Sequence, residues 1–224
     1  MDGRPKRRIT YASIFDKIII ILSFFSTVVP QLLMSSNRVM AEEKQNVTIT
    51  CIATGQPLPS ISWSKLVGNL PEDRTEVMNG TLTIHSVTRN DGGTYICKAE
   101  NILGSATDAA LVMIFPPLQF KVRPPLEVTP SVIGLSVRLS CMAESDLRTT
   151  ITWTKDGNSS LPVESNVLQN GTLLTRSIKN SHKGSYTCRA TNSLATIEAK
   201  VKINSPVITP SSCSLVRCKR KLRH

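Results

Sequence analysis

The chain of 224 residues has few of the residues that enzymes and metal proteins use. It has only three histidines, His85, His182 and His224, and none stands close to another in the sequence. None of its six cysteines forms a C-x-x-C pair, the spacing typical of zinc and thiol-redox sites. We find no glycine-rich phosphate loop, no nucleophile elbow and no motif of paired carboxylates. We therefore expect no metal, no cofactor and no enzymatic activity.

Acidic residues are also scarce, since 27 basic side chains face 16 acidic ones and give a formal charge of +11. The excess is concentrated at the two ends of the chain. Residues 1–29 hold five basic and two acidic side chains, and residues 205–224 hold five basic and no acidic ones. A nucleic-acid-binding domain carries its basic residues on the folded body. The charge distribution therefore argues against nucleic acid as a partner.

The N-terminus has the layout of an export signal. Four basic residues among the first eight precede the run from Ile18 to Val29, which is apolar apart from Ser and Thr and ends at Pro30. Twelve residues suit a signal peptide and are too few to span a bilayer unaided. We expect residues 1–29 to be either a cleaved signal or an uncleaved signal anchor. In both cases the rest of the chain lies outside the cytosol, secreted or held at the cell surface.

The rest of the chain contains an internal repeat of rare residues. In each copy a Trp follows a Cys by 12 residues, and a Tyr stands two residues before a second Cys. These residues are Cys51, Trp63, Tyr95 and Cys97 in the first copy, and Cys141, Trp153, Tyr186 and Cys188 in the second. The sequence Asn-Gly-Thr-Leu also recurs, at 79–82 and at 170–173. The repeat predicts two domains of the same fold.

Within each copy, apolar and polar residues alternate in short runs. Val47, Ile49 and Cys51 alternate with threonines, and Ile151 and Trp153 do the same. A period of two is typical of strands with one buried and one solvated face. Turns that contain glycine or proline separate the runs, and many short strands with such turns predict an all-β sandwich in each copy.

The order Cys, Trp, Tyr-x-Cys resembles the immunoglobulin fold, and the motif at 91–101 (DGGTYICKAEN) resembles its I-set subclass. The resemblance implies two tandem Greek-key β-sandwiches. The resemblance covers about residues 30–204 and places one domain at 30–115 and the other at 116–204. I-set domains occur in neural adhesion molecules and in hemicentin-like and peroxidasin-like matrix proteins. The resemblance is specific for fold and only weakly specific for function.

The resemblance also assigns structural roles to the repeated residues. It implies disulfides Cys51–Cys97 and Cys141–Cys188, each joining strand B to strand F and each contributing about 4 kcal/mol in the loop-entropy account. It places the two Trp residues against these disulfides. It also makes Tyr95 and Tyr186 tyrosine corners, with each hydroxyl bonded to nearby backbone.

The two copies differ at two positions of the family pattern. Asp91 stands four residues before Tyr95, where the family's Asp usually pairs with an Arg, and His182 replaces it in the second copy. The resemblance therefore implies that the second domain lacks this ion pair. Gly134 stands at the expected tight turn seven residues before Cys141, and Lys44 occupies the equivalent place in the first copy.

Four N-x-S/T sequons predict glycosylation of an exported protein, at Asn46, Asn79, Asn158 and Asn170. The alternative is that the Asn-Gly pairs serve only as turns.

Residues 205–224 form a basic tail whose charge is carried by Arg217, Lys219, Arg220, Lys221 and Arg223. Four interpretations are open: a solvated disordered end, a segment that binds heparan sulfate or acidic lipid, a furin-type processing site, and the start of a further module in a truncated or spliced form. Cys213 and Cys218 would bridge each other or link two chains.

We therefore expect an extracellular module that binds a cell-surface or matrix protein, with homophilic binding as one possibility. The alternatives are a soluble or truncated receptor ectodomain that acts as a decoy, and a matrix component that binds heparan sulfate through the tail. A muscle-type intracellular scaffold is opposed by the leader and the sequons.

Overall fold

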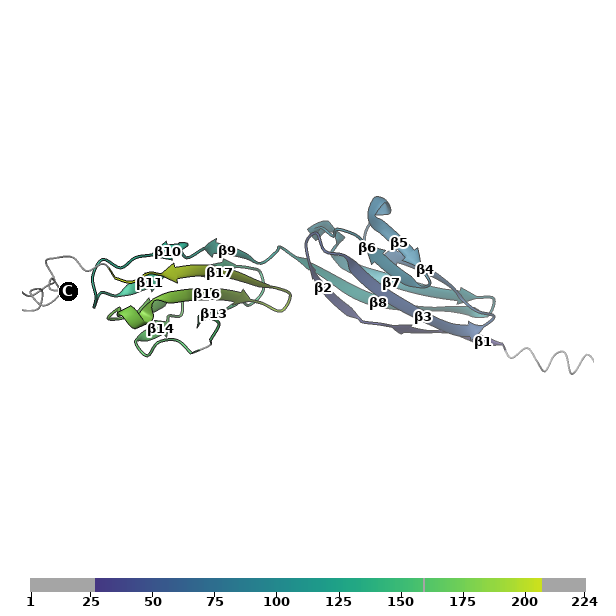
Figure 1. The fold of residues 1–224 in the computed structure, drawn as a ribbon. Coiled ribbons are helices and arrows are strands. Elements are labelled where there is room, and N and C mark those ends of the chain that lie inside the picture. Colours follow the sequence, from purple (N-terminus) through teal and green to yellow (C-terminus); the bar gives the residue numbers. More distant parts are fainter. Residues whose placement is uncertain (1–26, 159, 207–224) are drawn as a thin grey trace, which may run out of the picture. The chain divides into compact units, whose positions relative to one another are not determined.

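The computed structural model describes residues 27–158 and 160–206. Contacts within the chain divide it into two compact units, with the boundary between Ile114 and Phe115. We call these units domain 1 and domain 2 and describe each by itself (Figure 1).

Domain 1 is built from two four-stranded sheets. The first has the order β1-β3-β6-β5, with bounds Val28–Met34, Val47–Gln56, Thr81–Ile84 and Thr75–Met78. The second has the order β2-β8-β7-β4, with bounds Arg38–Glu42, Gly104–Phe115, Gly93–Asn101 and Ser60–Lys65. Two 3₁₀ turns complete the domain, η1 (Glu72–Arg74) and η2 (Arg89–Asp91). Strand β3 buries Val47, Ile49 and Cys51, because alternate residues of a strand point to the same face.

Domain 2 has a similar arrangement, except that the strand corresponding to β3 is divided into two short strands. Its larger sheet has the order β10-β17-β16-β13, with bounds Glu127–Val128, Thr196–Ile203, Gly184–Thr191 and Thr150–Lys155. The other strands form β11-β15-β14 (Val137–Leu139, Leu173–Thr175, Ser165–Val167) and the pair β12-β9 (Met142–Glu144, Gln119–Val122). The 3₁₀ turn η3 spans Asn180–His182. Cys141 lies in the gap between β11 and β12.

Each domain has one buried core crossed by one disulfide. Cys51–Cys97 links β3 to β7, and Cys141–Cys188 links the β11–β12 gap to β16, both with Cα atoms 6.5 Å apart. Each bond joins the two sheets of its sandwich. The predicted all-β fold of two tandem sandwiches, each with one such disulfide, is confirmed.

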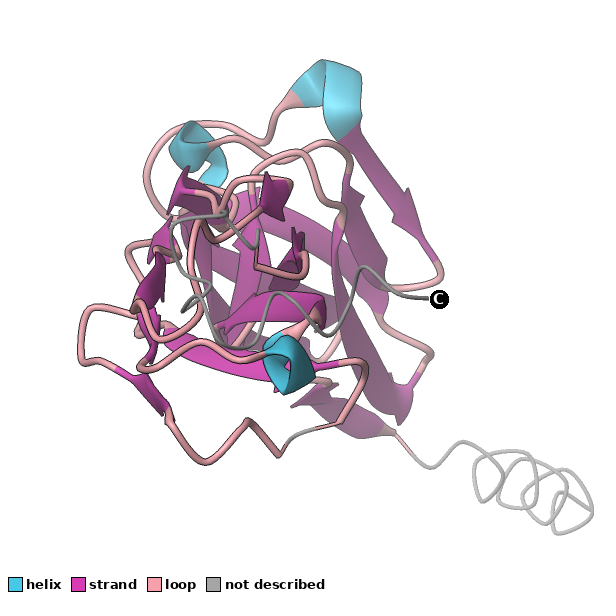
Figure 2. Ribbon diagram, turned by 60° about the vertical axis from the view of Figure 1, so that its left-hand side comes forward, coloured by secondary structure: helices cyan, strands magenta, loops and turns pink. Residues whose placement is uncertain are grey.

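Helical structure in the described residues is limited to the three short 3₁₀ turns, which are cyan among the magenta strands in Figure 2. A helix with the length and apolarity needed to cross a membrane is not found among these residues.

Candidate functional site

The indole of Trp63 is fixed by the backbone of Gly80. Its Nε1 donates to the Gly80 carbonyl at 3.1 Å, and the backbone N–H of Cys51 donates to the same oxygen at 3.1 Å. Gly80 has φ +78°, and a Cβ built on it would lie 2.4 Å from the carbonyl oxygen of Cys51. Only glycine fits here, because it has no Cβ and tolerates positive φ.

Domain 2 repeats this arrangement with Trp153 and Gly171. Trp153 Nε1 donates to the Gly171 carbonyl at 2.9 Å, and a Cβ on Gly171 would lie 2.3 Å from the carbonyl oxygen of Cys141. The repeated Asn-Gly-Thr-Leu is therefore a packing requirement beside the disulfide. Sequence reasoning found the repeat but missed this role. The glycine follows the Trp by 17 residues in the first copy and by 18 in the second, and this near-equal spacing could have suggested it.

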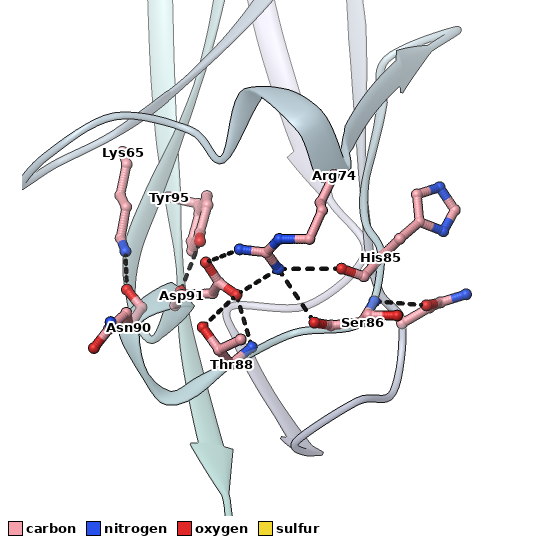
Figure 3. Close-up of polar contacts among 9 residues, drawn as sticks. Lys65, Arg74, His85, Ser86, Thr88, Asn90, Asp91 and Tyr95 are labelled. Carbon is pink, nitrogen blue, oxygen red and sulfur yellow. Dashed lines mark hydrogen bonds and ion pairs between the residues drawn. The ribbon is translucent and has the colours of Figure 1, made fainter.

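A polar cluster surrounds Asp91 at one end of domain 1 (Figure 3). Arg74 binds the carboxylate through two nitrogens, with Nη1 to Oδ2 at 2.8 Å and Nη2 to Oδ1 at 3.0 Å. The backbone N–H and the hydroxyl of Thr88 also donate to Oδ2. The hydroxyl of Tyr95 donates to the Asp91 carbonyl at 2.6 Å. This cluster fastens η1 and η2 to strand β7.

Burial and hydrogen bonding have opposite effects on the pKa of Asp91. Burial raises it, but the hydrogen bonds from Arg74 and Thr88 outweigh burial and hold the pKa of Asp91 below its ordinary 3.8. Burial also raises the pKa of Tyr95 to about 12. The ionised carboxylate of Asp91 is thus paired with the guanidinium of Arg74, and neither the pKa of Asp91 nor that of Tyr95 lies near 7.

Domain 2 replaces the Arg–Asp pair with Glu164 and His182. The backbone N–H of Lys179 donates to His182 Nδ1 at 2.9 Å, as the N–H of Thr88 does to Asp91. His182 Nε2 lies 3.2 Å from Glu164 Oε2, and Lys179 Nζ also pairs with Glu164. Tyr186 donates to the His182 carbonyl at 2.8 Å. A Glu–His pair therefore occupies the place that the Arg–Asp pair has in domain 1, and because Nδ1 of His182 accepts a backbone N–H, its Nε2 is the atom that donates to Glu164.

Lys44 and Gly134 make the same turn in the two domains. Lys44 has φ +72° and donates its N–H to the Val87 carbonyl, and Gly134 has φ +92° and donates to the Ile178 carbonyl. The domain 1 turn therefore keeps the left-handed conformation without glycine.

All four predicted glycosylation residues are exposed: Asn46, Asn79, Asn158 and Asn170. Asn46 and Asn170 use their carbonyl oxygens, which accept the backbone N–H groups of Ser86 and Thr172. Glycosylation modifies the amide nitrogen, so these bonds leave the acceptor atom available. Glycosylation itself stays a prediction.

The polar side chains of these clusters bond to one another and to the backbone. Among residues 27–158 and 160–206, no three His, Cys, Asp or Glu side chains are grouped so that they could hold a metal ion. An open hollow beside Glu164 and His182 is also lined by Lys155, whose Nζ donates to the Ser181 carbonyl at 2.9 Å. Lys155 is thus bonded to the backbone, and Glu164 and His182 are bonded to each other.

The outer face of sheet β1-β3-β6-β5 carries an exposed apolar pair. Leu33 and Ile52 are directly opposite each other on β1 and β3, and both are exposed. Thr50 and Thr81 continue this face and contact each other, with their Oγ1 atoms 3.1 Å apart. The apolar pair and the threonines beside it can be buried without desolvating a charge, whereas Glu76 on β5, opposite Thr83, marks the charged edge of this face.

Two predicted segments lie outside the described residues. They are residues 1–26 of the expected leader and the tail from residue 207, which includes Cys213, Cys218 and the predicted polyanion-binding residues. Their predictions stand untested.

Comparison with known proteins places the fold in a family. The family model described as immunoglobulin domain matches residues 29–101 and 121–192. Cell adhesion molecule DSCAML1 from Homo sapiens is 37% identical over 157 residues, which cover 68% of this chain and 8% of that protein. Roundabout homolog 1 from Mus musculus is 33% identical over 160 residues, which cover 67% of this chain and 10% of that protein. The chain thus spans about a tenth of the length of these relatives.

Solved structures agree with this assignment. Extracellular domains 3–5 of Drosophila OTK match with a TM-score of 0.65 and 28% identity over 80% of this chain and 63% of that one. Sidekick-1 immunoglobulin domains 1–4 match with a TM-score of 0.60 and 20% identity over 81% of this chain and 50% of that one, which shows the fold alone. With the paired disulfides, buried tryptophans and tyrosine corners, these matches lead to one conclusion: the chain belongs to the immunoglobulin-domain family.

Proposed function

We propose that this chain is an extracellular recognition module that binds a cell-surface or matrix protein and catalyses no reaction of its own. The observation that carries the proposal is the outer face of sheet β1-β3-β6-β5, where Leu33 and Ile52 stand exposed on a rigid, disulfide-linked sandwich. The similarity to cell adhesion molecule DSCAML1 also supports a role in recognition of another protein. The four exposed sequons and the two disulfides support an exported protein.

A bead assay with the full chain tests this proposal. Beads that carry the chain bind to cells if the partner is a different protein, and they aggregate with one another if binding is homophilic. Protease treatment of the cells removes the first kind of binding. We expect Leu33→Asp/Ile52→Asp to weaken whichever binding is seen by about tenfold or more, because each new carboxylate would be buried in the interface without a partner.

Val67→Asp is the matched control, because Val67 is also exposed and lies in the loop after β4, away from this face. Beads that bind neither cells nor each other contradict the proposed function. Binding that survives the double substitution moves it to another surface.

A further inference from the structure

A hollow in the surface of domain 2 lies beside the sequon residue Asn170. Its volume is about 230 Å³, and it is lined by strand β12, the start of β13 and the turn between β14 and β15. None of the lining residues is charged. The apolar ones are Met142, Ala143, Ile151 and Leu168, and the polar ones include Thr149, Gln169 and Asn170 itself. The hollow therefore combines apolar side chains with a hydroxyl and two amides.

The hollow is located where the strand that corresponds to β3 is divided. In domain 1, β3 runs on through Cys51, whose N–H donates to the Gly80 carbonyl at 3.1 Å. In domain 2 this strand is split into β11 and β12, and β12 pairs with β9 rather than with β15. Domain 1 has the equivalent sequon at Asn79, but the hollow beside it is lined in part by the carboxylate of Glu76. The two sequons thus have different surroundings.

The turn that carries Asn170 is held by three hydrogen bonds. The N–H of Leu168 donates to the Thr172 carbonyl at 2.9 Å, and the N–H of Gly171 donates to the Leu168 carbonyl at 2.9 Å. The side-chain Oδ1 of Asn170 accepts the N–H of Thr172 at 3.1 Å. This last bond fixes the plane of the amide, whose Nδ2 is the atom that a glycan modifies. A sugar attached there therefore starts from a defined position beside the hollow.

The chemistry of the first sugar of an N-linked glycan matches this lining. N-acetylglucosamine presents C–H groups and an acetyl methyl group beside its hydroxyl and amide groups. Met142 and Leu168 are still 37% and 38% exposed, so each has apolar surface left to cover. Contact between these groups removes apolar surface from water on both sides, while the polar groups of the sugar can bond to water or to the amides of the lining.

We infer that the first N-acetylglucosamine of a glycan on Asn170 lies in this hollow against Leu168 and Met142, and so forms part of the surface of domain 2. The covalent bond to Asn170 selects this occupant, because a tethered group has an effective concentration of about millimolar or more and needs little intrinsic affinity. Docking requires the predicted glycosylation and goes beyond it, since a sequon alone does not say whether its glycan contacts the protein. It is independent of the proposed recognition function.

The rate of enzymatic deglycosylation at each sequon tests this docking. The full chain is expressed in mammalian cells and treated, without denaturant, with the peptide N-glycosidase that cleaves between asparagine and the first sugar. Each cleavage converts that Asn to Asp, so peptide mass mapping gives a separate rate for each sequon. We expect the rate at Asn170 to be about tenfold or more below the rate at Asn46, because only the undocked fraction is a substrate. In the denatured chain the two rates should become similar.

Asn46 is the matched reference site. It is exposed, and its Oδ1 also accepts a backbone N–H, from Ser86 at 3.0 Å. The two residues before it, Lys44 and Gln45, are exposed and polar, whereas Leu168 stands two residues before Asn170. The two sites therefore share a held amide and differ in the apolar surface beside it.

Leu168→Ser separates docking from shielding by the turn alone. It removes an apolar contact but keeps the backbone bonds of the turn, and it should raise the native rate at Asn170 about threefold or more. Val167→Ser is the matched control, because Val167 is 41% exposed but does not line the hollow, and it should leave the rate unchanged. Thermal unfolding of both variants checks that domain 2 is intact.

Four results would each overturn the docking. Equal native rates at Asn170 and Asn46 would show that the sugar is free in solution. A slow rate at Asn170 that Leu168→Ser leaves unchanged, or that both variants raise equally, would assign the protection to the turn. An unmodified Asn170 in a chain that carries glycans elsewhere would remove the occupant without refuting glycosylation. Four unmodified sequons would refute glycosylation as well.

Discussion

The imidazole Nε2 of His182 lies 3.2 Å from Oε2 of Glu164, at the place where domain 1 holds Asp91 against Arg74. The order of the two side chains is reversed, because the acidic residue comes first in domain 2 and second in domain 1. Both pairs brace the 3₁₀ turn that precedes the tyrosine corner. Both domains therefore hold a hydrogen-bonded donor–carboxylate pair at this position, with the carboxylate on either partner.

His182→Asp should destabilise domain 2 by about 1–3 kcal/mol, because it brings a second carboxylate beside Glu164 at a buried position. The double substitution Glu164→Arg/His182→Asp recreates the domain 1 pair and should recover most of the loss. Urea unfolding of the single and double variants measures both effects. A double variant no more stable than His182→Asp alone would show that the two positions are not coupled.

Alkaline titration should unfold the protein as its buried tyrosines ionise. Burial raises the pKa of Tyr95 and of Tyr186 to about 12, above the ordinary 10 that applies in the unfolded chain. The unfolded state therefore releases these protons first, and the associated stability is lost as the pH rises from 10 toward 12. Tyrosinate absorbance and circular dichroism recorded together provide the check. Ionisation of all three tyrosines near pH 10 with the fold intact would contradict it.

Gly171→Ala should cost about 2–4 kcal/mol of unfolding free energy, because the new methyl group would meet the Cys141 carbonyl and the backbone would be left at φ +80°. Gly157→Ala is the matched control, since Gly157 has φ +82° but nothing within 4 Å of the added Cβ. It should cost only the strain of the positive φ, about 1 kcal/mol. Equal losses in the two variants would show that the contact with Cys141 does not matter.

Lys44→Gly should stabilise domain 1 by up to about 1 kcal/mol. A non-glycine residue in the left-handed region is strained by about 1–2 kcal/mol, and the greater entropy of glycine in the unfolded chain offsets part of the gain. Lys44→Ala keeps the positive φ of +72° and controls for loss of the charge. The thermal midpoint should rise for the first variant only. A rise for both would assign the effect to the charge.

Expression in a secreting animal cell should add glycans at the exposed sequons. Replacing each of the four Asn residues with Asp in turn should remove one step of mobility, and glycosidase should remove all of them. Asp is preferred to Gln because Asn79 has φ +49°, which Asp tolerates better than most residues. Mobility unchanged by glycosidase would contradict the glycosylation prediction.

The amino-acid sequence by itself determined the fold class, because alternation with a period of two defines strands with one buried face. The disulfide pairing followed from the resemblance of the repeated Cys, Trp and Tyr-x-Cys pattern to the immunoglobulin fold, in which these cysteines join the two sheets.

Only the tertiary structure decided which distant residues meet. Arg74 and Asp91 are 17 residues apart, Glu164 and His182 are 18 apart, and Asn101 bonds to Val28 across 73 residues. No local pattern encodes such contacts, because they arise when strands far apart in sequence pair within a sheet or pack across the sandwich. The Glu164–His182 pair is a consequence of that packing, and so it could be found only after the chain was folded.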